Sequence, residues 1–192
     1  MKRYTFTLIE ILGVIAIIGI LATLGFAGYS YANGKARESA TKGLITRLDA
    51  ALEFAKEKSG YLPPAKDNFV TIKIDEAGKT VTIGSKTCAY NATATATKEE
   101  KMYSDFYRHF VKSVQMDSMS RFLNENNEVI DAWGNVIYFR YPGKLKTGGF
   151  DLISAGSDGV FGSEEKSAPD DDDDLSKYRS GAEWICDDIA NF

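Results

Sequence analysis

The sequence holds little of what marks several protein classes. Its 192 residues include two cysteines and four prolines, which excludes a disulfide-dense scaffold and a collagen-like chain. The 23 basic and 27 acidic side chains give a net charge of −4, so no basic footprint for nucleic acid is present. Because 44% of the residues are hydrophobic, the chain is not disordered, and its length bounds it to one modest globular domain with appendages.

The two ends of the chain depart strongly from this average. Residues 11–34 form a run of 24 without a charged side chain, whereas residues 170–174 are five consecutive aspartates with a charge of −5. The rest of the chain therefore sums to −4 − (−5) = +1. Apolar and acidic character are concentrated at opposite ends.

Residues 6–29 are long and apolar enough to cross a bilayer. As a helix these 24 residues would reach about 36 Å at roughly 1.5 Å per residue. Lys2 and Arg3 precede them. A secretory signal peptide has the same beginning, but a good cleavage signal is missing here. The pattern favours a retained transmembrane helix.

One carboxylate, Glu10, lies inside this apolar stretch. An isolated carboxylate in hydrocarbon costs a few kcal/mol or more, so it has to be protonated or to meet a positive partner in a protein assembly. Cleavage before Phe6 would create such a partner, because the new ammonium of one subunit would pair with Glu10 of a neighbour. This pairing would set the register of stacked helices.

The residues Phe6-Thr7-Leu8-Ile9-Glu10, followed by an apolar helix, resemble the class III signal of type IV pilins and type II secretion pseudopilins. The resemblance implies cleavage between Thr5 and Phe6 by a prepilin peptidase, methylation of Phe6, and a homo-oligomeric helical filament in which Glu10 registers the next subunit. Two features depart from the family pattern: Thr5 stands where Gly is usual, and the helix-breaking Pro of many members is absent. Whether Thr5 permits cleavage stays open.

The helix is expected to continue beyond the membrane. In residues 35–59, apolar side chains recur at spacings of three and four, which predicts one buried stripe, and Gly60 with Pro63 and Pro64 ends the helix. The predicted divisions are a leader (1–5), an assembly helix (6–29), an amphipathic helix (30–60), a variable region (61–128), and a C-terminal sheet with its loop and tail (129–192).

The variable region is predicted to hold a hairpin and a helix. Residues 69–74 and 80–83 alternate apolar and polar side chains around a turn, and residues 98–116 show a helical aromatic stripe. We interpret the stripe as core and not as a cofactor site. The only histidine, His109, has no partner for catalysis at a recognisable spacing, so we expect it to be structural or exposed.

Two strands are predicted in the last third, residues 136–141 and 150–154, paired antiparallel after the turn at 131–135. Major pseudopilins of type II secretion have similar motifs in this order: D-x-W-G-N, a strand ending in Pro-Gly, and D-[ILV]-x-S-x-G-x-D-G. The resemblance covers about residues 6–62 and 129–178, and residues 63–128 look like an insertion. The fold class expected is α+β, with a long N-terminal helix packed on a small C-terminal antiparallel sheet that carries a calcium loop.

Oxygen donors gather near the C-terminus in the way that Ca²⁺ requires, and no nearby histidine or cysteine favours zinc. The spacing excludes an EF-hand, and a solvated acidic tail is the alternative. The resemblance implies one Ca²⁺. Its ligands would be Asp158, two carboxylates among Asp172, Asp173 and Asp174, and the carbonyls of Ala155 and Val160. Such a metal would order the loop and stabilise the domain.

The two thiols, Cys88 and Cys186, admit one disulfide if the domain is exported to an oxidising compartment. Two free buried thiols are the alternative. The sequence gives no distance between them.

A structural function is favoured: a pilin-like filament subunit, most similar to a major pseudopilin of type II secretion. The alternatives are an extracellular type IV pilin, or a membrane-anchored periplasmic enzyme or binding domain. We expect no enzyme, since a phosphate loop, a zinc-ligand pair and a nucleophile elbow are all missing. The partners implied are the prepilin peptidase, an inner-membrane assembly platform and minor pseudopilins. The chain would span the bacterial inner membrane once, with its N-terminus cytoplasmic, and then enter a periplasmic or cell-surface filament.

Overall fold

The structure is a computed structural model. It describes residues 8–91, 93, 95–146, 148–161, 179–180, 183–184 and 189–191. The chain divides into two compact units, Met1–Arg37 and Glu38–Phe192, and helix α1 contributes to both. The class is α+β, as predicted from the sequence.

Helix α1, Leu8–Ser59, is continuous over 52 residues, which confirms the predicted long helix. In the first unit its large apolar side chains between Leu8 and Leu21 are exposed, by 52% at Ile11 to 81% at Leu8. Among the described residues it is the one helix long and apolar enough to cross a membrane. A surface of this kind is compatible with lipid or with other apolar helices and not with water.

The second unit begins where α1 acquires a buried face. Leu44, Leu48 and Leu52 are at most 2% exposed, at the spacing of four that places them on one stripe. The helix ends at the predicted place, because the Gly60 N–H donates to the Lys56 carbonyl at 2.9 Å and closes the last turn.

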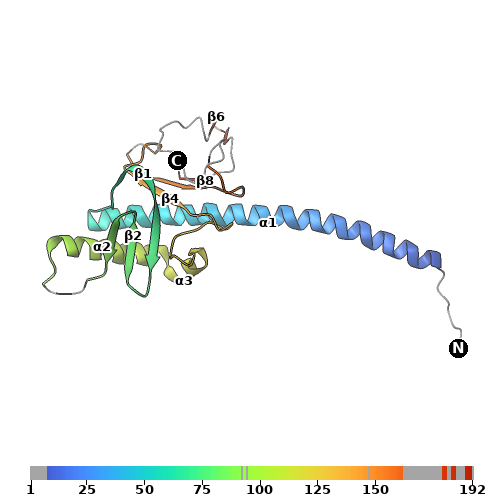
Figure 1. Ribbon diagram of the computed structural model, residues 1–192, viewed down its shortest axis with the longest axis horizontal. Helices are drawn as coiled ribbons and strands as arrows, with labels where there is room; N and C mark the ends of the chain where they lie inside the picture. Colours follow the sequence, from blue (N-terminus) through green and yellow to red (C-terminus); the bar gives the residue numbers. More distant parts are fainter. Residues whose placement is uncertain are drawn as a thin grey trace. The chain divides into compact units, whose positions relative to one another are not determined.

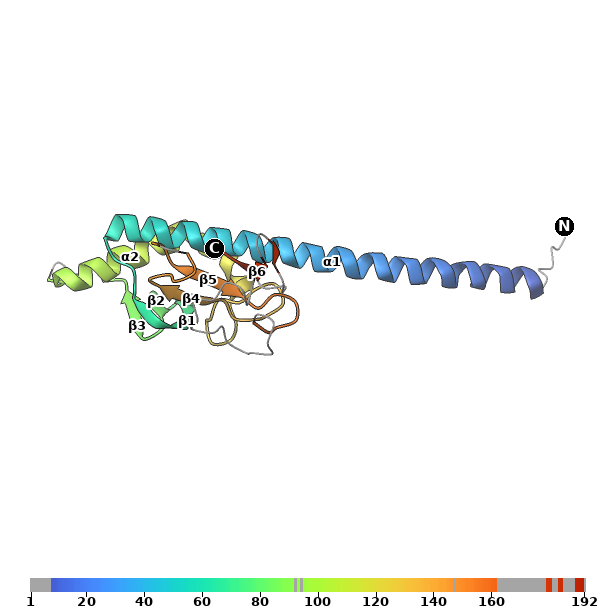
Figure 2. The same ribbon diagram turned by 90° about the horizontal axis from the view of Figure 1, so that it is seen from above.

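A six-stranded antiparallel sheet packs with this stripe, in the order β3-β2-β1-β4-β5-β8 (Figures 1 and 2). Its strands are β1 Ala65–Asp75, β2 Thr80–Ile83, β3 Lys86–Ala89, β4 Tyr138–Tyr141, β5 Asp151–Ser154 and β8 Ile189–Ala190. A separate pair consists of β6 Arg179–Ser180 and β7 Glu183–Trp184.

The predicted hairpin is confirmed as β1 and β2, and the predicted C-terminal pair as β4 and β5. β4 and β5 are shorter than predicted. Val136 and Ile137 lie before the start of β4, and Phe150 lies before the start of β5. The structure also adds strands that the sequence analysis did not predict. β3 pairs with β2, and β8 pairs with β5.

The region expected to be an insertion contributes half of the main sheet. β1 pairs with β4, with Val70 opposite Phe139 and a register shift between Ala65 and Val70. The three strands β1 to β3 therefore extend the C-terminal sheet and form no sheet of their own. A sequence pattern gives the strands but not their partners, because pairing over some 70 residues leaves no local signal.

Helix α2, Lys98–Val114, starts at the predicted residue and ends two residues earlier than predicted. Thr97 caps it: its hydroxyl accepts the Glu100 N–H, and the Glu100 carboxylate accepts the Thr97 N–H. These hydrogen bonds lower the pKa of Glu100. Helix α3, Met116–Met119, and a 3-10 turn, Ser120–Phe122, follow through Gln115, whose backbone φ is +56°.

Helices α1 and α2 run antiparallel (Figure 1), and the ring of His109 on α2 lies edge-on to that of Phe54 on α1, with their centroids 5.6 Å apart. Arg47 on α1 also donates to the Ser118 hydroxyl on α3 at 2.6 Å. The aromatic stripe of α2 is core, as predicted, since Phe106 and Phe110 are fully buried. His109 is half-buried, in agreement with a structural or surface role. The main core joins both helices to one face of the sheet.

A second, smaller apolar cluster lies on the face of β4 and β5 that is opposite the main core. It contains Leu145, Ile153, Ala155 and Phe161, with Tyr138 packed against it. Since side chains alternate along a strand, Phe139 and Leu152 belong to the main core. Residues 155–161, the described start of the loop after β5, thus pack on an apolar cluster of their own.

The main core gives a first prediction. Phe110→Ala removes a fully buried ring that stacks on Phe106 at 5.9 Å, and is expected to lower the free energy of unfolding by about 3–5 kcal/mol. Urea unfolding of the full chain in detergent micelles measures this. The matched control is Phe54→Ala, a ring that is 37% exposed, with an expected loss under about 1.5 kcal/mol. Equal losses for the two variants would contradict the packing described.

Candidate functional site

The N-terminal site residues are only partly within the structure. Thr5 and Phe6, the predicted cleavage and methylation residues, lie outside the described residues. Glu10 lies in the first turn of α1 and is exposed. A carboxylate in the first helical turn is favoured by the helix dipole. Its predicted role in assembly involves a second subunit and is not tested by one chain.

The D-x-W-G-N motif forms a tight turn, residues 131–135. Its carboxylate organises it: Asp131 Oδ1 accepts the backbone N–H groups of Trp133 and Asn135, each at 2.8 Å. The Asp131 N–H donates in turn to the Asn135 carbonyl at 2.8 Å. The buried hydroxyl of Thr41, on α1, accepts the Ala132 N–H at 3.1 Å and joins the turn to the helix.

Hydrogen bonds connect this turn to the end of β5 in a closed ring, here termed the Asp131 ring. Besides the Asn135 N–H on Oδ1, Asp131 accepts the Ser154 hydroxyl on Oδ2 at 2.7 Å. The Gly156 N–H donates to Ser154 Oγ at 3.2 Å, and the Asn135 side-chain amide donates to the Gly156 carbonyl at 2.8 Å. Asp131 and Ser154 are 2% and 0% exposed, so the hydrogen bond between them is shielded from water.

The predicted metal loop starts from this ring. Ala155 is buried at 1% exposure and Asp158 is exposed. Asp158 Oδ1 accepts the Val160 N–H at 2.9 Å. Gly159 has φ +78°, a conformation that favours glycine, and a Cβ there would lie 3.3 Å from Asn135 Oδ1. The loop therefore turns back tightly onto Asn135.

The described part of this loop supplies hard oxygen donors. These are the Asp158 carboxylate and backbone carbonyls, the donor type that Ca²⁺ prefers. Within the described ranges, three or more His, Cys, Asp or Glu side chains do not gather in a metal-binding group. Asp172, Asp173 and Asp174, the other predicted ligands, lie outside those ranges. The donors of the described residues fit a hard divalent cation in kind.

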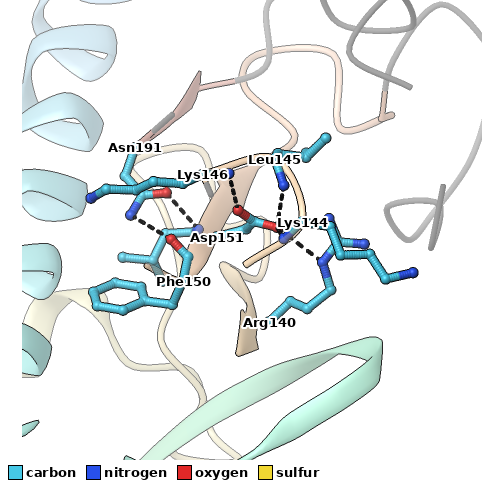
Figure 3. Close-up of polar contacts among 8 residues, drawn as sticks. Arg140, Lys144, Leu145, Lys146, Phe150, Asp151 and Asn191 are labelled. Atoms are coloured by element: carbon cyan, nitrogen blue, oxygen red, sulfur yellow. Dashed lines mark hydrogen bonds and ion pairs between the residues drawn. The ribbon is translucent and has the colours of Figure 1, made fainter. Parts of the chain in front are cut away.

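A buried ion pair lies beneath the preceding loop, residues 142–150 (Figure 3). Arg140 and Asp151 are both fully buried, and Arg140 donates to Asp151 Oδ2 through Nε at 3.0 Å and Nη2 at 2.7 Å. The Asp151 carboxylate also accepts three backbone N–H groups, those of Lys144, Leu145 and Lys146, at 2.7 to 3.2 Å. One carboxylate thus neutralises a buried cation and shapes the loop.

Asn191 holds the C-terminal strand on the same side of the molecule (Figure 3). Its Oδ1 accepts the Leu152 N–H at 2.8 Å, and its Nδ2 donates to Asp49 at 2.6 Å and to the Phe150 carbonyl at 3.1 Å. Lys146 joins this group through its ion pair with Asp49 at 2.8 Å. Strand β8 is therefore tied to both β5 and α1.

The acidic run lies, along the sequence, between two anchored residues. Before it, Phe161 is 4% exposed and meets the Tyr138 ring edge-on at 5.5 Å. After it, Ile189 is 6% exposed and pairs with Ser154. Ile189 thus pairs with a residue of the Asp131 ring.

Cys88 is a free, fully buried cysteine on β3, and burial raises the pKa of its thiol to about 12. Cys186, its predicted partner, lies outside the described residues. The disulfide stays a prediction.

Several residues of this region were missed by the sequence analysis. Thr41, Arg140 and Asn191 were not singled out, although each makes a long-range polar contact. A signal existed for the ion pair, because opposite charges occur in two strands predicted to pair. Thr41 and Asn191 carry no such signal, since single polar residues in a helix and near a strand are common.

The buried pair gives a second prediction. Asp151→Asn leaves the Arg140 guanidinium buried without a counter-charge and is expected to lower the free energy of unfolding by about 3–5 kcal/mol. Urea unfolding of the full chain measures it. Asp105→Asn is the matched control, because the Asp105–Arg108 pair is half-exposed, and its expected cost is below about 0.5 kcal/mol. A small loss for Asp151→Asn would show that the pair is dispensable.

Comparison with known proteins gives one family. The model of type II secretion system protein G matches residues 112–170, fewer than half of the residues. No curated protein and no solved structure matches the chain. The matched segment contains β4, β5, the whole Asp131 ring and Asp158, whereas the pilin-like residues 6–10 lie outside it. The match supports a relationship to the pseudopilin family, whose members are structural secretion subunits.

Proposed function

We propose that this chain is a structural subunit of a type II secretion pseudopilus, its major pseudopilin, that assembles through α1. The observation that carries the proposal is the protein G match over residues 112–170, which includes the Asp131 ring and the loop that follows it. The exposed apolar helix in the same chain supports a membrane-inserted precursor and a helical filament core.

The partners follow from this role. A prepilin peptidase would cut before Phe6 and the new amine would be methylated, and an assembly platform with minor pseudopilins would start the filament. Lys2 and Arg3 favour a cytoplasmic N-terminus under the positive-inside tendency. The domain of residues 38–192 would then lie in the periplasm.

Glu10 is the assembly residue in this proposal. It lies among side chains that are more than half exposed, such as Ile9 and Ile11, and a filament would bury these in an apolar core. A carboxylate in such a core has to be protonated or paired with a cation, and the amine of a processed Phe6 in the next subunit is suited to supply the cation.

Glu10→Leu is expected to abolish filaments while the domain still folds, because the change removes the charge that sets the register and leaves α1 apolar. Electron microscopy of the assembled protein and circular dichroism of the purified chain measure the two properties. The control is Glu57→Leu on the same helix, at a side chain that is 73% exposed beside Lys58, which should assemble normally.

Filaments formed by Glu10→Leu would refute the role of Glu10. Mass spectrometry of the mature chain tests processing, with a methylated Phe6 expected at the N-terminus. A mature chain that starts at Met1, or a cut near residue 27, would remove the main support for a filament subunit and favour a membrane-anchored domain.

We also propose that the loop after β5 holds one Ca²⁺, through Asp158, two of Asp172 to Asp174 and the carbonyls of Ala155 and Val160. The oxygen donors on the loop support this, as does the placement of the acidic run between the anchored residues Phe161 and Ile189. Bound Ca²⁺ would offset the repulsion among the carboxylates and order the loop.

Ca²⁺ is expected to raise the melting temperature of the full chain, because a ligand that binds the folded state at 100 times its Kd stabilises it by about 2.7 kcal/mol. Thermal unfolding with Ca²⁺, Mg²⁺ or EDTA measures this. Asp158→Asn should lose most of the shift, and Asp105→Asn, on the exposed face of α2, should keep it. A melting temperature insensitive to EDTA would contradict the site.

A further inference from the structure

The Asp131 ring meets the loop on both sides of Asp158. On the preceding side, the ring fixes both polar groups of the Gly156 backbone, its N–H on Ser154 and its carbonyl on the Asn135 amide. On the following side, Gly159 packs so tightly on Asn135 that a Cβ would come within 3.3 Å of its Oδ1. Asn135 therefore contacts the loop both two residues before Asp158 and one residue after it.

The ring is built to hold one geometry. Each of its four hydrogen bonds involves a residue that a second hydrogen bond of the ring also holds. Oδ1 of Asp131 holds the Asn135 backbone N–H, and Oδ2 of Asp131 holds the Ser154 hydroxyl. Burial of Asp131 and Ser154 makes loss of a partner costly, because water does not replace it. Ala155, whose carbonyl is a proposed ligand, lies between two ring members along the chain.

We infer that Asn135 and Ser154 are positioning residues for the cation loop: they bind no cation themselves and set the backbone from which Asp158 and the Ala155 carbonyl are presented. The inference rests on the proposed Ca²⁺ site and goes beyond it, since it names residues on a separate turn and strand that determine its affinity. Groups that orient metal ligands in this way typically change metal affinity by 10–100-fold when they are removed.

The ring also joins the loop to α1. Thr41 accepts the N–H of Ala132, the residue next to Asp131, and it is the first fully buried side chain of α1 within the second unit. The turn at 131–135 thus contacts the helix through Ala132 and the loop through Asn135. Through this turn, the positioning residues Asn135 and Ser154 are connected to α1, the longest element of the domain.

The experiment opens the ring at two independent points in the full chain, held in detergent micelles. Ser154→Ala removes the hydroxyl that joins Asp131 to Gly156, and Asn135→Ala removes the amide on the Gly156 carbonyl and keeps its own backbone N–H on Asp131. Both changes are neutral, so neither alters the charge near Asp158. Calorimetric titration with Ca²⁺ gives the Kd, and thermal unfolding in EDTA gives the stability of the cation-free chain.

Asn124→Ala is the matched control. Asn124 also organises a turn, since its Oδ1 accepts the N–H groups of Asn126 and Glu128, each at 2.9 Å, and it does not belong to the ring. The control separates general loss of stability from a specific loss of cation affinity, because its change is the same in type and its turn has no contact with the loop among the hydrogen bonds described.

The Kd for Ca²⁺ is expected to rise at least tenfold in both ring variants and to stay within twofold in Asn124→Ala, although all three lower the melting temperature in EDTA. Ring variants with the Kd of the unchanged chain would overturn the inference and leave the site standing. An unchanged chain without Ca²⁺ binding would overturn both. If a ring variant unfolds in EDTA, the Ca²⁺ concentration that restores folding replaces the Kd, and a value equal to that of Asn124→Ala would overturn the inference.

Discussion

The domain depends on one apolar stripe of α1. Leu44, Leu48 and Leu52 bring to the core a rigid surface against which both α2 and the sheet bury their inner faces. The stripe belongs to a helix whose other part has no buried side chain among those that the structure describes, so one helix has to satisfy two environments. Its sequence changes accordingly near residue 38, from apolar all round to amphipathic.

Against this apolar base, the C-terminal half is ordered by buried carboxylates. Asp151 holds the loop before β5 and Asp131 holds the turn before β4, and each accepts several backbone N–H groups. Asp151 has a cation as its partner, whereas the partners of Asp131 in the ring are neutral. Buried polar groups tolerate few hydrogen-bond geometries. These two residues therefore fix the conformation of the turn and the loop more tightly than the short strands alone would.

Much of this fold follows from sequence patterns. The long helix, its end at Gly60, the β1–β2 hairpin, α2 and the β4–β5 pair rest on periodicity and turn residues, which are local signals. The pairing of β1 with β4 and the addition of β8 depend on contacts between distant segments and were not predicted. In the site, the motif around Asp131 and the loop at Asp158 were recognised in the sequence as separate segments. The hydrogen bonds that join them through Ser154 and Asn135 are seen only in the structure.

The buried Cys88 has a consequence for how the domain can be observed. With a pKa of about 12, roughly one thiol in 10⁵ is ionised at neutral pH, and thiol reagents attack the thiolate. The side chain is also fully buried in the main core. Thiol reagents therefore modify Cys88 only after a local opening of the domain. The rate of modification at Cys88 then measures that opening without any added label.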